Sequence, residues 1–271
     1  MARADEKLGK ESSARTAFEE IAEQTNYYGF LAADRLRLPY SFNSEPVEQQ
    51  DDIVKKLRNL PGMKRAVELQ ALGRVTDARR EWNFITRDLN TEELKNAAVL
   101  AHEWKWHDTA INTLAKVGEW RDLDRRFPLP YKDLVLLNAE THGLDPSLIF
   151  GVARRESAFN RAARSSAGAL GLMQILPGTA RLQSRVLGLS RPSIADLLDS
   201  DRNILLGSSY LNAMLERFSG NQVLATAAYN AGPNRVKKWI PESGSMPADL
   251  WIETVPYKET RHYVRAVLAY T

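Results

Sequence analysis

Glu156 occupies a position in the sequence where a carboxylate is unusual. The segment that it ends begins with Asp145, a good helix N-cap, and Pro146, which suits the first position of a helix. At about 100° per residue, Glu156 shares one stripe of this predicted helix with Ile149 and Val152. A carboxylate on the apolar face of a helix loses solvation, so its pKa rises. A glutamate with a raised pKa can act as a general acid near neutral pH.

Polar side chains also gather among small or apolar residues in three later segments. These segments are 165–174 (SSAGALGLMQ), 228–232 (AYNAG) and 256–261 (PYKETR). The two glycines of the first segment allow close approach of the backbone or a positive φ. Each polar group can either contact a ligand or satisfy the backbone of its own loop. Glu156 has a comparable structural alternative, because interior ion pairs also shift pKa values.

The composition is that of an ordinary globular protein and excludes several kinds of chemistry. Of the 271 residues, 44% are hydrophobic and 26% are charged, and the net charge is +3. Cysteine is absent, so disulfides, zinc thiolate sites and thiol nucleophiles are excluded. No basic run interleaved with aromatic residues indicates a nucleic-acid groove, and we expect no nucleic-acid partner. His102 and His107 are five apart and do not share a helix face, so we expect no metal and no cofactor.

The sequence also lacks membrane and export signals. No stretch of about 18 apolar residues exists, so we expect no membrane span. The first five residues are partly charged and lack an apolar core, unlike a signal peptide. If the protein is exported, we expect this chain to be a mature fragment.

Strand signals are nearly absent, and we expect an all-α protein. In the first 120 residues, a small turn, an alanine and an aromatic residue recur at 8–18 and again at 72–82, an offset of 64 residues. A weaker copy follows at 104–110, about 32 residues later. This period favours paired antiparallel helices stacked as a solenoid.

Two prolines, Pro128 and Pro130, break the helical pattern and form a natural hinge. We therefore expect two domains. Residues 1–126 form a region of helical repeats or a linker, and residues 127–271 form a second helical domain.

The order of ES, GALGLMQ, AAYNAG and ETR resembles the catalytic domain of the soluble lytic transglycosylases. Members of this family have a lysozyme-like fold and act on peptidoglycan. The resemblance runs from Leu129 to Thr271. The helical repeats resemble the superhelix and linker of the same family, whose superhelix is longer, so the chain looks truncated at its N-terminus. The resemblance implies a periplasmic location.

The resemblance also implies a reaction at Glu156. This residue would protonate the oxygen that leaves C1 of N-acetylmuramic acid, at the β-1,4 bond to N-acetylglucosamine. It would then take the proton of the same sugar's C6 hydroxyl, and the product would be a 1,6-anhydro sugar. The positions that match the family's substrate-binding residues are Ser165, Gln174, Tyr229, Asn230 and Glu259.

Two alternatives remain open at this stage. A hydrolytic muramidase of the goose-lysozyme type would share the fold but would need a second carboxylate. The residues that could supply it are Asp196, Asp199, Glu216 and Glu259. In the other alternative the catalytic domain is inert and the helical repeats are a scaffold for other proteins. Peptidoglycan strands are the expected partner, and other cell-wall enzymes could bind through the helical segment.

Overall fold

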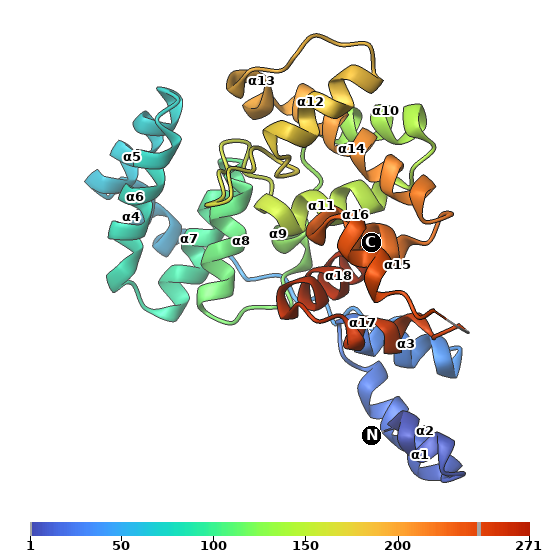
Figure 1. The fold of residues 1–271 in the computed structure, drawn as a ribbon. Coiled ribbons are helices and arrows are strands. Elements are labelled where there is room, and N and C mark those ends of the chain that lie inside the picture. Colours follow the sequence, from blue (N-terminus) through green and yellow to red (C-terminus); the bar gives the residue numbers. More distant parts are fainter. Residues whose placement is uncertain (1, 243–244) are drawn as a thin grey trace.

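The computed structural model describes residues 2–242 and 245–271, and it is helical throughout (Figure 1). The described residues form no β-strand. They contain two isolated β-bridges, Arg164–Leu170 and Leu170–Ile175, both in one loop. The prediction of an all-α fold is confirmed. In the described part of the chain, no helix is long and apolar enough to cross a membrane.

The first part of the chain consists mainly of short helices joined by tight turns. They are α1 (Ala2–Lys7), α2 (Glu11–Ala22), α3 (Tyr27–Leu36), α4 (Asp51–Asn59), α5 (Pro61–Ala71), α6 (Val75–Ile85), the 3-10 helix η1 (Thr86–Asp88), α7 (Thr91–Glu103), α8 (His107–Lys116) and α9 (Leu123–Arg126).

The tight turns within three helix pairs have the same geometry, which also closes α3 at Arg37 and α8 at Gly118, and these three turns coincide with the three copies of the sequence repeat. Gly9, Gly73 and Lys105 all have a positive φ, of 72°, 73° and 61°. In each case the next residue's N–H donates to a carbonyl five residues back, at 2.8–2.9 Å, and closes the preceding helix. The repeat therefore encodes the helix pairs α1/α2, α5/α6 and α7/α8.

The pairs do not all stack in one array. Trp82 of α6 lies edge-on to Trp104 and Trp106, at ring distances of 6.3 and 5.9 Å, so the second and third pairs share a core. The first pair shares a small core around Phe18 with α3, and Arg3 of α1 forms an ion pair with Asp249 of α17. The predicted solenoid is therefore correct for α5–α8 and wrong for α1 and α2.

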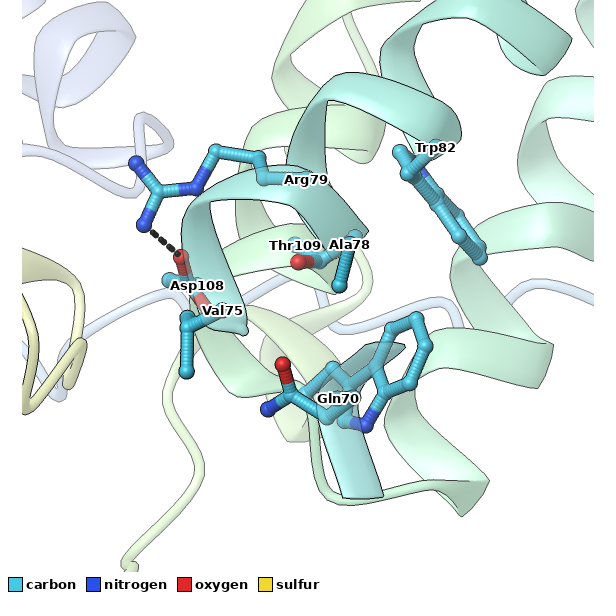
Figure 2. Close-up of a pocket in the computed structure, with 8 residues that line it drawn as sticks. Gln70, Val75, Ala78, Arg79, Trp82, Asp108 and Thr109 are labelled. Carbon is cyan, nitrogen blue, oxygen red and sulfur yellow. Dashed lines mark ion pairs between the residues drawn. The ribbon is translucent and has the colours of Figure 1, made fainter. Parts of the chain in front are cut away.

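The stacked pairs leave one small hollow, shown in Figure 2. Its volume is about 20 Å³, which is room for one water molecule. At its edge Arg79 of α6 pairs with Asp108 of α8 at 3.3 Å. Burial raises the pKa of Asp108, and the cation of Arg79 opposes this shift. The hollow is thus a packing void that is bordered by an ion pair.

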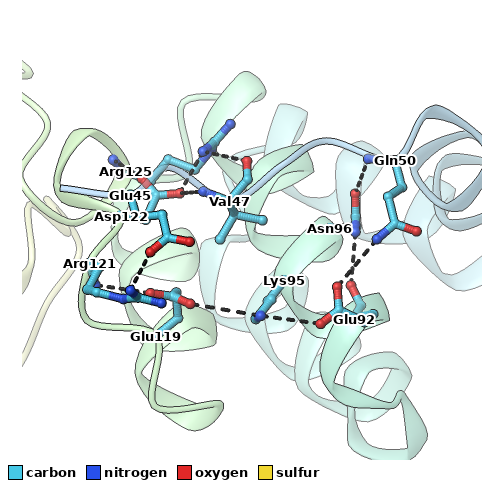
Figure 3. Close-up of polar contacts among 10 residues, drawn as sticks. All are labelled: Glu45, Val47, Gln50, Glu92, Lys95, Asn96, Glu119, Arg121, Asp122 and Arg125. Atoms are coloured by element: carbon cyan, nitrogen blue, oxygen red, sulfur yellow. Dashed lines mark hydrogen bonds and ion pairs between the residues drawn. The ribbon is translucent and has the colours of Figure 1, made fainter.

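An extended segment, residues 45–50, links α3 to α4 and is bound along its length (Figure 3). The Val47 N–H donates to the buried carboxylate of Asp122 at 2.9 Å, and Arg125 donates to the same oxygen at 2.6 Å. The Gln50 N–H donates to the buried Asn96 side chain of α7 at 2.8 Å. These bonds satisfy an otherwise unpaired backbone and fix the segment against α7 and α9.

The second part of the chain is a compact set of longer helices. They are α10 (Lys132–His142), α11 (Pro146–Ser157), α12 (Pro177–Val186), α13 (Ile194–Leu198), α14 (Ser200–Arg217), α15 (Gln222–Ala231), α16 (Pro233–Trp239), α17 (Ala248–Thr254) and α18 (Lys258–Tyr270). Helix α11 packs against α10 and α18, and α14 packs against α10, α12, α13 and α15. Its central core includes Ile149, Val152, Leu172 and Met173.

Helix α3 connects the two parts, because it packs against α2 on one side and against α18 of this second part on another. Tyr27 is buried in a core cluster with residues of α14, α15 and α18. The Tyr28 hydroxyl donates to Glu253 at 2.8 Å, and Arg265 of α18 donates to the same carboxylate at 3.2 Å. Between α3, α9 and α18 lies a cavity of about 1270 Å³ with many aromatic residues in its lining.

Candidate active site

Glu156 lies where the sequence predicted it, near the C-terminus of α11. Asp145 caps the helix by accepting a hydrogen bond from the Ser147 N–H at 2.8 Å, and Pro146 is its first residue. Ile149 and Val152 on the same stripe are fully buried. The chain then leaves the helix abruptly, because Ala158 and Phe159 both have a positive φ. The carboxyl group is therefore held between a rigid helix and a sharp turn.

The surroundings of Glu156 favour the protonated form. Burial raises its pKa from the ordinary 4.5 to about 7, and the exposed carboxylate of Glu259 adds to this rise. Two neighbours act in the opposite direction. The Tyr263 hydroxyl donates to Glu156 Oε1 at 2.7 Å, and the cation of Arg155 lies nearby. A carboxyl that titrates near neutrality can release and recover a proton in one reaction cycle.

Tyr263 was not predicted as a site residue, yet it, rather than the predicted Tyr229, donates a hydrogen bond to Glu156. The Tyr229 hydroxyl donates to the Met173 carbonyl at 2.9 Å, whereas the hydrogen bond to Glu156 comes from α18. Both tyrosines are buried, and burial raises the pKa of each well above its ordinary value. A signal for Tyr263 was present in the sequence, because it lies four residues before Val267 and so shares its buried face.

The loop between α11 and α12 is held by a network of buried hydrogen bonds. Asn203 of α14 accepts from the Met173 N–H at 2.8 Å and donates to the carbonyls of Leu170 and Leu197. Ser157 donates to the Leu172 carbonyl at 2.7 Å. These contacts connect the loop directly to the helix that carries Glu156, so its shape is fixed relative to the carboxyl group.

Two predicted site residues belong to this loop and take part in its own bonding. The Gln174 amide, in a residue with φ 47°, donates to the carbonyls of Gly171 at 2.9 Å and Ala163 at 3.2 Å. Ser165 is exposed, and its hydroxyl accepts from the Ala169 N–H at 2.9 Å. Gln174 therefore braces the loop, and Ser165 stays open to solvent.

The remaining predicted site residues lie where α15 meets α18. The Thr260 hydroxyl donates to Asn230 at 2.8 Å and connects the two helices. Glu259 is exposed. It forms no ion pair with Arg261 in the structure as described, and that guanidinium donates to the Val255 carbonyl at 2.6 Å instead. Among the predicted residues, Tyr229 and Glu259 interact electrostatically with the carboxyl group of Glu156.

Three of the four carboxylates considered for a second catalytic role have other functions. Asp196 forms a capping box with Ser193 at the start of α13, and Asp199 caps α14 through the Arg202 N–H. Glu216 accepts from Asn212 one turn earlier in α14. Glu259 is the one of the four whose charge affects the pKa of Glu156.

Neither metal ligands nor the large cavity adds to this site. No three His, Asp or Glu side chains come together to hold a metal ion within residues 2–242 and 245–271. The rings of His102 and His107 do pack together, with their centres 6.0 Å apart. None of the predicted site residues lines the large cavity beside α3.

The fold and the site together define a lysozyme-like helical domain that is preceded by helix pairs. Two family models match the chain: "Transglycosylase SLT domain" over residues 133–252, and "Soluble lytic murein transglycosylase L domain" over residues 56–123. The chain belongs to the soluble lytic murein transglycosylase family.

Individual relatives support this assignment. The soluble lytic murein transglycosylase of Escherichia coli K12 is 35% identical over 266 residues, which are 97% of this chain and 41% of that protein. The Salmonella typhimurium relative is 33% identical with the same coverage. The chain thus spans about two-fifths of the length of these relatives.

Solved structures support the same family assignment. An inactive mutant of lytic transglycosylase Slt from Pseudomonas aeruginosa superimposes with a TM-score of 0.94 at 40% identity, covering 99% of this chain and 44% of that one. The 70 kDa soluble lytic transglycosylase of Escherichia coli gives 0.93 at 33% identity with the same coverage. A structure of the 70 kDa soluble lytic transglycosylase in complex with bulgecin A is also similar to this chain.

Proposed function

We propose that this chain is a peptidoglycan lytic transglycosylase. It cleaves the β-1,4 bond between N-acetylmuramic acid and N-acetylglucosamine without water and leaves a 1,6-anhydro end. The observation that carries this proposal is the single carboxyl group of Glu156, with a pKa of about 7 and a hydrogen bond from Tyr263. Membership of the soluble lytic murein transglycosylase family supports it.

One carboxyl group is sufficient for this reaction. In the first step, protonated Glu156 donates its proton to the glycosidic oxygen as the C1–O bond breaks. In the second step, the Glu156 carboxylate accepts the proton of the C6 hydroxyl while that oxygen bonds to C1. This attack occurs within one sugar, so it has little entropic cost. Glu156 is protonated again at the end, and no water is consumed.

A hydrolase would need a second carboxylate to activate water or to bond to the sugar. Asp196, Asp199 and Glu216 are used in helix caps or local contacts, which argues against that role for them. Glu259 is exposed and close enough to affect the pKa of Glu156. We assign Glu259 to sugar binding, with its oxygens free to accept from hydroxyl groups.

The other predicted residues have proposed roles that follow from their contacts. Ser165, exposed at the tip of the loop, is proposed to bind the muramic acid. Gln174 and Tyr229 keep the loop in place through its carbonyl groups, so we propose that they shape the sugar-binding surface. Asn230 positions α18 through Thr260.

The remaining proposals concern the whole protein. We propose that its partner is the glycan strand of periplasmic peptidoglycan, as for the family, and that the helix pairs could bind other cell-wall enzymes. We retain residues 126 and 127 as the boundary between the helical repeats and the catalytic domain.

The decisive experiment is mass spectrometry of the sugar products after digestion of purified peptidoglycan. Products one water lighter than reducing-end muropeptides, absent with Glu156→Gln, support the proposal. Reducing-end products would identify a hydrolase instead. Full activity of Glu156→Gln, in a variant with unchanged circular dichroism, would refute the role of Glu156.

A further inference from the structure

Two exposed cations, Arg155 and Lys258, lie on the two helices that supply Glu156 and Tyr263, and these helices pack against each other. Arg155 directly precedes Glu156 in α11. Its side chain is exposed, and its guanidinium lies 5.9 Å from the centre of the Tyr263 ring. Lys258 is the exposed first residue of α18, the helix that carries Tyr263. In the described part of the chain, neither side chain forms a hydrogen bond or an ion pair. We call Arg155 and Lys258 the basic rim.

The neighbouring arginines show what a structural cation looks like here. Arg154 donates to the Arg126 carbonyl at 2.6 Å and packs over the rings of Phe127 and Tyr270. Arg261 and Arg265 are likewise bonded to a carbonyl and a carboxylate. Within the described residues the side chains of the basic rim form no such hydrogen bond or ion pair, although Arg155 lies over the Tyr263 ring.

The two rim residues lie at one helix junction, because Arg155 lies over the ring of Tyr263 and Lys258 begins the same helix five residues earlier. Loss of solvation and then the cations of Arg265, Lys258 and Arg155 lower the pKa of His262, which is exposed one turn after Lys258. Arg155 also lowers the pKa of Glu156 itself. The positive end of the α18 dipole lies at Lys258 and adds to this field. The residue after Lys258, Glu259, is an exposed carboxylate, so the two cations of the rim lie beside one negative charge.

We propose that Arg155 and Lys258 form a carboxylate-binding subsite for the acidic group that muramic acid carries. Muramic acid has a lactyl ether on the ring whose C1 bond would break. Its carboxyl group is either free or bonded to a peptide that has carboxylates of its own. The planar fork of a guanidinium matches a carboxylate, and a lysine adds a point charge. This inference rests on the proposed function and adds the feature by which the site would select its substrate.

A subsite of this kind acts on substrate binding more than on chemistry. A contact made equally in the bound substrate and in the transition state changes KM and leaves kcat nearly constant. Removal of the Arg155 charge has one further effect. This cation lowers the pKa of Glu156, so Arg155→Gln raises that pKa and moves the alkaline limb of the pH–rate profile upward.

The test measures binding and turnover separately with three kinds of glycan strand. The strands are peptide-bearing, peptide-free with a free lactyl carboxylate, or methyl-esterified so that no carboxylate remains. Kd is measured in a Glu156→Gln background, which does not depend on turnover. KM and kcat are measured with active Glu156. The variants are Arg155→Gln, Lys258→Gln and the charge-conserving Arg155→Lys.

Arg185→Gln is the matched control. Arg185 is also an exposed arginine in the last turn of a helix, α12. We expect Arg155→Gln and Lys258→Gln each to raise Kd and KM about tenfold or more on strands with carboxylates, and to change neither on esterified strands. Arg155→Lys should recover most of the loss, and Arg185→Gln should have no effect.

The outcomes distinguish the lactyl carboxylate from the peptide carboxylates. They also distinguish failure of the subsite from failure of the proposed function. A loss confined to peptide-bearing strands identifies the peptide carboxylates, and a loss confined to peptide-free strands identifies the lactyl group. Equal losses on esterified strands, or unchanged Kd in every variant, would overturn the subsite. If active protein releases no anhydro products from any strand, the proposed function fails, and the Kd values still decide the subsite.

Discussion

The Tyr263 hydroxyl donates a hydrogen bond to Glu156 Oε1 at 2.7 Å and connects the last helix of the chain to the C-terminus of α11. Tyr263 is 3% exposed, so this bond forms in a region from which water is largely excluded. The bond stabilises the carboxylate, and burial favours the neutral acid. The balance of these two effects keeps the pKa of Glu156 near 7.

Tyr263→Phe should therefore weaken catalysis and shift its pH dependence. Loss of the hydrogen bond raises the pKa of Glu156, so the alkaline limb of kcat moves to higher pH. A hydrogen bond to a charged group contributes about 1.5–3 kcal/mol, so we expect kcat to fall about tenfold or more at the optimum. The measurement is a pH–rate profile of anhydro-product formation.

Tyr229→Phe is the control for that experiment. It removes a buried hydroxyl of the same type, whose bond goes to the Met173 carbonyl. We expect a loss of about 1 kcal/mol of stability and an unchanged alkaline limb. Identical limbs in the two variants would show that the Tyr263 hydroxyl does not control the acid.

The raised pKa of Glu156 also predicts how stability depends on pH. The carboxyl group has a pKa of about 7 in the folded protein and an ordinary value of 4.5. Folding therefore favours the protonated form. This stabilisation is complete below pH 4.5 and is lost as the pH rises through 7.

Glu156→Gln, which is neutral at every pH, should be more stable than the parent at pH 8 by roughly 3 kcal/mol. The difference should disappear near pH 4. Urea unfolding at both pH values measures it. A constant difference between the two proteins across this range would mean that the pKa of Glu156 is the same in both states.

Two glycines of the loop before α12 provide a matched pair of substitutions. Both have a positive φ, 83° at Gly168 and 77° at Gly171. A Cβ at Gly168 would meet nothing within 4 Å, whereas one at Gly171 would lie 2.4 Å from the Leu197 carbonyl oxygen. Gly168→Ala therefore carries only the backbone cost, about 1–2 kcal/mol.

Gly171→Ala adds a clash with the backbone and with Asn203, the residue that holds this loop. We expect about 3 kcal/mol or more of destabilisation, together with a loss of activity. Chemical denaturation and product assays on the two variants test this. Equal effects at the two positions would show that the loop can move away from Asn203.

The sequence predicted the local features of the site well. The Asp145 cap, the start of α11 at Pro146 and the inward position of Glu156 all follow from spacing along one helix. The hydrogen-bond partner of Glu156, Tyr263, could not be predicted from spacing along one helix. A periodic pattern shows that Tyr263 faces the interior, but the contact with α11 depends on how two distant helices pack.

One other difference has the same origin. The repeat at residues 8–18 predicted stacking on the later helix pairs. The extended segment 45–50 instead carries the chain across to α7, and α3 packs through Tyr27 on the second domain. Local patterns determine which face is buried, and long-range contacts determine which element covers it.

The third copy of the repeat gives the last prediction. Lys105 occupies the turn position that glycine occupies in the other two copies, with a φ of 61° against 72° at Gly9 and 73° at Gly73. A residue with a Cβ is strained in this left-handed conformation by about 1–2 kcal/mol, and glycine is not. Lys105→Gly should relieve this strain, while the more flexible unfolded chain of the glycine variant offsets part of the gain. We therefore expect a net stabilisation of about 1 kcal/mol. Gly73→Lys should destabilise it to a similar extent. Thermal unfolding of both variants measures this, and a destabilised Lys105→Gly would mean that the lysine side chain contributes more than its backbone strain costs.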